Sequence, residues 1–215
     1  MKLFDKKEIL PILIILASMA MGIYFLPALP SQVPSHWNVY GQIDGWVSKT
    51  FAVYFFPALT LVIYLLLSFF PLMDPRRKNI EKFSGIYFGF KLVTTAFLSG
   101  LYFLTLWAGL GHEVNVGRWV VWGIAVMFLY LGIVMPKLKH NYTIGIRFPW
   151  TLHSEVVWEK THKLGGKLFI ALAVLLAVAG VWPGEGAFCA LLIGIFAVLI
   201  VLLLYSYLEY RKLNK

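Results

Sequence analysis

The chain has a single cysteine, Cys189, and charged residues make up only 13% of its 215 positions. One cysteine cannot form an intramolecular disulfide, so a disulfide framework is excluded. Soluble domains carry about 25% charged residues and about 45–50% apolar ones, whereas 60% of this chain is hydrophobic. Each segment between the apolar runs is too short to enclose a hydrophobic core of its own. We therefore expect no soluble domain.

The hydrophobic residues are grouped in blocks, which is typical of a polytopic membrane protein. Most blocks approach the roughly 20 residues needed to cross about 30 Å of hydrocarbon. We therefore predict an all-α fold in which residues 1–215 form a single membrane domain. The first block is longer than the apolar region of a signal peptide, so we expect it to be retained. The six predicted spans are Ile9–Pro27, Phe51–Met73, Ser84–Leu110, Trp119–Pro136, Leu168–Pro183 and Ala187–Leu208.

The net charge of +9 is arranged as a topology signal rather than as a nucleic-acid-binding surface. Sixteen of the 19 basic residues lie before the first span, after the sixth, or in the connections after the second and fourth spans. Lysine and arginine favour the cytoplasmic side of a membrane. We therefore expect both termini to be cytoplasmic and the lipid bilayer to surround the spans, with no direct contact to nucleic acid.

The segment 28–50, ALPSQVPSHWNVYGQIDGWVSKT, is predicted to form an extracellular cap loop. It is rich in tryptophan and tyrosine, whose amphipathic rings suit the headgroup layer of a membrane. Its polar and aromatic side chains are therefore candidates for contact with a ligand that approaches along the outer surface. These candidates are His36, Trp37, Asn38, Tyr40, Asp44 and Trp46.

The segment 137–167 is predicted to be a cytoplasmic loop that contains an interfacial helix. Thr151 is expected to cap a helix that begins near Leu152, and Gly165-Gly166 is expected to end it. The polar and aromatic composition of this helix suits a position on the inner membrane surface.

Three residues of this helix, Glu155, Glu159 and His162, share one face at helical spacing. Two carboxylates and an imidazole form a ligand set for zinc, which leaves a metal-dependent membrane enzyme as one alternative. The other interpretation is a solvated face of acids, because this spacing is common and the HExxH motif is absent.

Lys91 is the one charged residue inside a predicted span. An intramembrane lysine suggests a functional site, and a small-solute transporter centred on Lys91 is therefore a further alternative. Lys91 also lies only about two turns from the inner end of its span, where a snorkelling side chain accounts for it equally well.

Two stretches resemble known families. LPSQVPSHWNVYGQIDGWVSK, from Leu29 to Lys49, resembles a domain of unknown function with the pattern LPxxxPxHWNxxGxxDGW. PKLKHNYTIGIRFPWTLHSEVVWEKTHKLGGK, from Pro136 to Lys167, resembles the signature of the SdpI family of bacterial and archaeal membrane proteins. Phe148 and His140 depart from the residues most frequent there. The matching residues are Gly145-Ile146-Arg147, Pro149-Trp150-Thr151-Leu152, Trp158, Thr161-His162 and Gly165-Gly166.

The SdpI resemblance implies a prokaryotic cell-membrane protein that gives immunity to a secreted, membrane-active peptide toxin, without catalysis and without a cofactor. It also implies a sensor role, in which the toxin-loaded protein holds a cytoplasmic transcriptional repressor at the membrane. The signature loop then supplies the candidate contacts to such a partner. These candidates are Arg147, Trp150, Thr151, Glu155, Trp158, Glu159 and His162.

Overall fold

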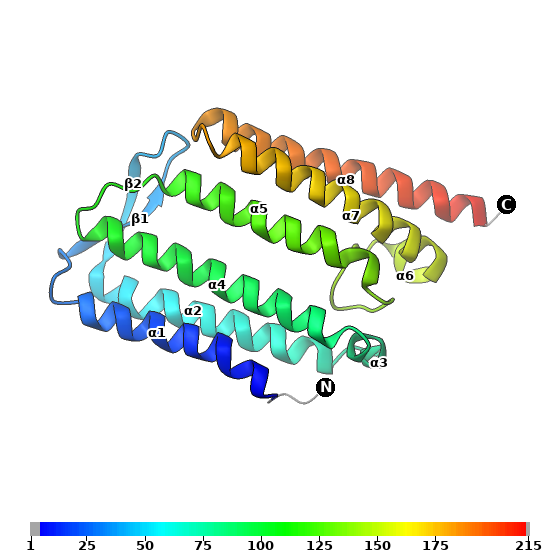
Figure 1. Cartoon of the computed structure of the whole chain (residues 1–215), viewed down its shortest axis with the longest axis horizontal. Coiled ribbons are helices and arrows are strands. Elements are labelled where there is room, and N and C mark those ends of the chain that lie inside the picture. Colours follow the sequence, from blue (N-terminus) through cyan, green and yellow to red (C-terminus); the bar gives the residue numbers. More distant parts are fainter. Residues whose placement is uncertain (1–4, 214–215) are drawn as a thin grey trace.

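The computed structural model describes residues 5–213 as a bundle of long helices with a small β-hairpin at one end (Figure 1). The six helices that are long and apolar enough to cross a membrane are Lys6–Phe25, Lys49–Leu72, Ser84–Gly109, Val116–Lys137, Glu155–Ala179 and Glu185–Leu213. The predicted six-span, all-helical membrane fold is confirmed. Lys2 and Lys215, which contribute to the predicted orientation, lie outside the described residues.

The elements follow each other along the chain without long irregular connections except before α6. They are the short helix η1 (Lys6–Glu8), α1 (Ile9–Phe25), β1 (Gln32–Trp37), β2 (Ile43–Ser48), α2 (Lys49–Phe69), η2 (Phe70–Leu72), α3 (Arg77–Glu81), α4 (Ser84–Gly109), α5 (Val116–Val134), η3 (Met135–Lys137), α6 (Pro149–His153), α7 (Glu155–Ala179) and α8 (Glu185–Leu213).

The six long helices form two groups of three, which we call the N-terminal half (α1, α2 and α4) and the C-terminal half (α5, α7 and α8) (Figure 1). α1 begins and α8 ends at the same end of the bundle. We call this the signature end, because residues 74–83 and 137–155 also lie there. The opposite end, where β1 and β2 lie, is the hairpin end.

Each half has its own hydrophobic core, and a third cluster joins the halves at the signature end. The N-terminal half is packed around Leu29, Val33, Ala52, Val53, Tyr102 and Leu106. The C-terminal half is packed around Val121, Ala125, Leu172, Leu176 and Ala187. The joining cluster consists of Ile80, Phe83, Tyr87, Met135, Leu138 and Trp158. The halves are therefore bound together mainly where the signature segment lies.

The predicted cap is a two-stranded antiparallel hairpin, which adds a small β element to the expected all-helical fold. β1 and β2 pair from Gln32 opposite Ser48 to Trp37 opposite Ile43. Asn38 closes the turn, since its side-chain oxygen accepts hydrogen bonds from the backbone N–H groups of Tyr40 and Gln42, both at 3.0 Å. Such side-chain bonds to the following backbone are the usual reason for asparagine in a turn. The hairpin is therefore a defined surface rather than a loose loop.

The helix predicted from Leu152 to the glycine pair differs from the one observed. α7 begins at Glu155, is capped by Ser154, and continues through Gly165-Gly166 to Ala179 as a membrane span. The predicted end was wrong because these glycines serve packing: a Cβ on Gly166 would lie 2.8 Å from the carbonyl oxygen of Gly132 in α5. Small residues permit such close approach of membrane helices. The predicted interfacial helix is thus the first part of the fifth span.

Candidate functional sites at the two ends of the bundle

A buried aspartate attaches the signature segment to the N-terminal half. Asp74, 5% exposed, follows η2. Its carboxylate accepts hydrogen bonds from the backbone N–H groups of Arg76 and Tyr142, at 2.7 and 2.8 Å, and from the hydroxyl of Thr143 at 2.6 Å. A carboxylate that accepts several hydrogen bonds tolerates burial. Asp74 therefore holds the irregular stretch 138–148 against the connection between α2 and α4.

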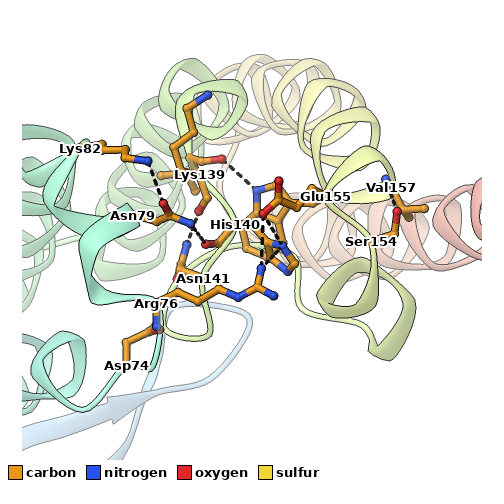
Figure 2. A network of polar contacts seen from close by, with 12 residues as sticks. Asp74, Arg76, Asn79, Lys82, Lys139, His140, Asn141, Ser154, Glu155 and Val157 are labelled. Carbon is orange, nitrogen blue, oxygen red and sulfur yellow. Dashed lines mark hydrogen bonds and ion pairs between the residues drawn. The ribbon is translucent and has the colours of Figure 1, made fainter.

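Arg76, His140 and Glu155 form a second junction between the halves (Figure 2). The Arg76 guanidinium donates to Nδ1 of His140 and lies 3.6 Å from the Glu155 carboxylate. The side chain of Asn79 also donates to the His140 carbonyl oxygen, at 2.8 Å. Burial and the neighbouring Arg76 lower the pKa of His140 from its ordinary value, although Glu155 partly opposes this. His140 is therefore neutral near pH 7, and its Nδ1 can accept the hydrogen bond that Arg76 donates.

His162 lies in the interior of the signature end, where both of its ring nitrogens have partners. Nδ1 lies 2.8 Å from the Trp158 carbonyl oxygen, to which it donates, and Nε2 accepts from the backbone N–H of Ile146 at 3.0 Å. The indole of Trp158 donates to the Leu138 carbonyl oxygen at 2.9 Å and stacks on the His162 ring. His162 and Trp158 are each 1% exposed. Together they fix the path of the loop over α7.

This arrangement does not support the zinc alternative. The His162 ring is turned inward, whereas the Glu155 side chain is 73% exposed and directed toward Arg76. Within residues 5–213, no group of three or more His, Cys, Asp or Glu side chains is placed to hold a metal ion. The sequence spacing was compatible with a metal site, but the ring orientation is not.

The seven signature candidates separate into buried and accessible residues. Thr151, Trp158 and His162 are buried, and Trp150 is half-buried, with its indole donating to Ser206 in α8 at 2.6 Å. These four side chains stabilise the signature end. The side chains left accessible to a partner are those of Arg147, Glu155 and Glu159.

Gly145 provides a test of this packing. Its φ of +126° is unfavourable for other residues, and a Cβ there would lie 2.5 Å from Nε2 of His162. We expect Gly145→Ala to lower the free energy of unfolding by about 3 kcal/mol through backbone strain and overpacking. Gly184 has a φ of +133° but no atoms within 4 Å of such a Cβ. Gly184→Ala should therefore lose only the strain contribution in thermal unfolding, and equal losses in both variants would contradict the steric argument.

The hairpin end presents the six cap candidates. Tyr40 and Trp46 are 66% and 54% exposed, and Trp37 and Asn38 are half-buried. His36 and Asp44 face each other across the strands, with Nδ1 and a carboxylate oxygen 2.5 Å apart. The Tyr40 hydroxyl donates to Glu185 at the start of α8, at 3.2 Å. The hairpin thus rises from the N-terminal half and touches the C-terminal half, which Figure 1 shows.

Lys91 is paired inside the N-terminal half. Its Nζ lies 2.7 Å from one Glu8 carboxylate oxygen and 3.3 Å from the Ser68 hydroxyl. The second Glu8 oxygen accepts from the Tyr64 hydroxyl at 2.7 Å, and the ammonium lies over the Tyr64 ring. Each charged group therefore has a partner, as burial of charges requires. The side chain does not snorkel, because its ammonium is buried against Glu8, Ser68 and Tyr64.

Sequence reasoning missed three buried acids: Glu8, Asp74 and Glu209. Glu209 in α8 accepts from Lys160 of α7 and from Lys212, at 2.5 and 2.6 Å. The chain has only ten acidic residues, and each of these three adjoins the end of a span. A scarce acid near the end of a span was the signal that could have found them.

Comparisons with known proteins match two segments of the chain to protein families. Residues 137–206 match the SdpI/YfhL protein family, and residues 13–61 match a domain of unknown function, DUF1648. The chain is 29% identical over 212 residues to "Immunity protein SdpI" of Bacillus subtilis (strain 168), which covers 97% of this chain and 98% of that protein. These matches support an SdpI-family protein. Its family match begins at Lys137, so it includes the whole loop 138–148, α6, α7 and most of α8.

The similarity to the SdpI immunity protein supports a membrane immunity role. No solved structure matches the chain. Within the family match, the buried residues of the signature end hold the fold of the loop, and the exposed charges form its surface.

Proposed function

We propose that the chain is an immunity protein of the SdpI type, which protects its producer from a secreted, membrane-active peptide toxin without catalysing a reaction. The observation that carries this proposal is similarity to an immunity protein along nearly the whole chain. A role in catalysis would require a cluster of reactive groups, whereas Asp74, His162 and Lys91 are each engaged in hydrogen bonds or an ion pair that hold the fold.

The hairpin is the proposed toxin-contact surface. Its exposed rings, Tyr40 and Trp46, lie at the end of membrane-spanning helices, where an amphipathic peptide bound to the headgroup layer would meet them. The neighbouring pair His36 and Asp44 supplies polar contacts. Aromatic residues with one polar edge are frequent anchors in interfaces.

The signature end is the proposed contact surface for a cytoplasmic repressor, in the orientation that the distribution of basic residues predicts. Arg147, Glu155 and Glu159 offer exposed charges there. Coupling to the hairpin would require two arrangements of the halves with different affinity for toxin. The polar contacts Tyr40–Glu185 at one end and Arg76–His140 at the other are the junctions that such a change would alter.

The test is survival of a toxin-sensitive host that expresses this chain. We expect wild type to protect, and we expect Trp46→Ala and Tyr40→Ala to reduce the tolerated toxin concentration by about tenfold, which corresponds to about 1.4 kcal/mol of lost binding. Trp182→Ala is the matched control, because Trp182 is 74% exposed, follows α7 at the hairpin end and lies outside the hairpin. Failure of wild type to protect would refute the proposal.

A further inference from the structure

An apolar cavity of about 440 Å³ lies between the two halves, and none of its wall residues belongs to the signature loop or to the hairpin. Its walls come from α4 and α5 alone. They are formed by Phe97, Gly100, Leu101, Phe103, Leu104, Trp119, Trp122, Gly123 and Val126. Both helices are membrane spans, and the wall residues Phe103, Trp119 and Val126 are 40%, 51% and 58% exposed. The cavity therefore opens sideways between the two helices, toward the bilayer.

The cavity follows from how α4 and α5 pack. Toward the signature end the Tyr130 hydroxyl donates to the Ile86 carbonyl oxygen at 2.6 Å, and the helices are in direct contact. Toward the hairpin end Gly100 has no atom within 4 Å of the position that a Cβ would occupy. The ring of Phe97 lies on Gly123 and forms the floor. Because Gly100 has no side chain, a groove remains between α4 and α5 toward the hairpin end.

A basic side chain packs on one wall of this groove. Arg118 is in the first turn of α5, next to Trp119, and its guanidinium lies 5.8 Å from the ring centre of Trp122. Both tryptophans line the groove. The guanidinium makes one long hydrogen bond, 3.4 Å from Nη2 to the Val181 carbonyl oxygen. The guanidinium therefore lies at the level where the span reaches the headgroup layer, and its positive charge can pair with an anion there.

We propose that this groove binds one phospholipid, with an acyl chain between α4 and α5 and the phosphate at Arg118. The occupant must enter from the bilayer, since the opening is lateral, and it must be apolar along its length and anionic at its end. A phospholipid has this combination. The bound chain completes the interface between the two halves where protein side chains do not.

Native mass spectrometry of the full chain, purified in mild detergent from phospholipid membranes, tests the proposal. Wild type should retain one phospholipid through washes that remove the rest. Gly100→Phe should fill the groove, since a Cβ there would meet no atom within 4 Å, and should lower retention at least tenfold. Arg118→Gln should lower it several-fold. Gly85→Phe is the control, because Gly85 is also in α4, lies outside the groove and has no atoms near a Cβ.

Equal retention by wild type and Gly100→Phe would overturn the proposal, as would retention that is independent of Arg118. A second measurement uses wild type alone, so that it does not depend on the folding of a variant. A phospholipid with a photoreactive acyl chain should label the groove residues of α4 and α5, whereas labelling spread evenly over all six spans would overturn the proposal. Loss of toxin protection in Gly100→Phe with unchanged lipid retention would assign the groove to a peptide instead.

Discussion

Lys91→Met should lower the free energy of unfolding by about 3–5 kcal/mol, because it leaves the Glu8 carboxylate buried without its cation. The Glu8 side chain is 11% exposed and lies at the start of α1, so solvent cannot replace the lost ammonium. The Tyr64 hydroxyl would remain the main donor to this carboxylate. Thermal unfolding in detergent, together with the yield of folded protein from membranes, measures the effect.

The double variant Glu8→Gln, Lys91→Met removes both charges and should recover most of the loss, since the cost arises from one uncompensated charge. Lys167→Met is the matched control: Lys167 is exposed on α7 and should change stability by less than about 0.5 kcal/mol. If the single and double variants were equally unstable, the ion pair would not be the reason for the burial of Lys91.

Asp74→Asn should cost about 3 kcal/mol and release the loop 138–148 from the N-terminal half. The amide has nearly the same shape, but in either orientation its NH2 group faces a donor that the carboxylate accepted, the N–H of Arg76 or the N–H and O–H of Tyr142 and Thr143. A buried donor without an acceptor costs about 1–3 kcal/mol, and more where a charged acceptor is lost. Asp74→Asn should therefore lower both the stability of the whole protein and the local stability of the loop 138–148.

Hydrogen exchange separates these two effects. Backbone amides of residues 138–148 should exchange faster in Asp74→Asn, whereas those of the hairpin strands Gln32–Trp37 and Ile43–Ser48 should keep their wild-type rates. Glu113→Gln is the control, because Glu113 is exposed in the connection between α4 and α5. Unchanged exchange in residues 138–148 would show that Asp74 does not anchor the loop.

The sequence predicted the spans well because burial in a bilayer depends on local composition. An apolar run of about 20 residues leaves few alternatives to a helix across the membrane. The limits of the fifth span were wrong, since the polar stretch from Glu155 to Lys167 appeared too hydrophilic for a span. In the structure its polar face packs against the loop 138–148, where His162 and Trp158 have partners far from them in the sequence.

The candidate sites also depend on partners that are distant in the sequence. The signature residues were identified from their pattern, but the pattern did not distinguish Thr151 and Trp158, which are buried, from Glu159, which is exposed. Lys91 was recognised as unusual, yet its partner Glu8 lies 83 positions away. Contacts of this kind depend on which helices pack together, and local spacing does not contain that information.

The number of spans, the membrane location and the resemblance to the SdpI family were determined by the sequence alone, because hydrophobic length and two distinctive motifs are local properties of the chain. Only the tertiary structure decided which charges are paired, which signature side chains are accessible and where the halves leave a groove. Each of these depends on side chains that folding brings together from distant positions, and the cost of burying a polar group is set by those neighbours.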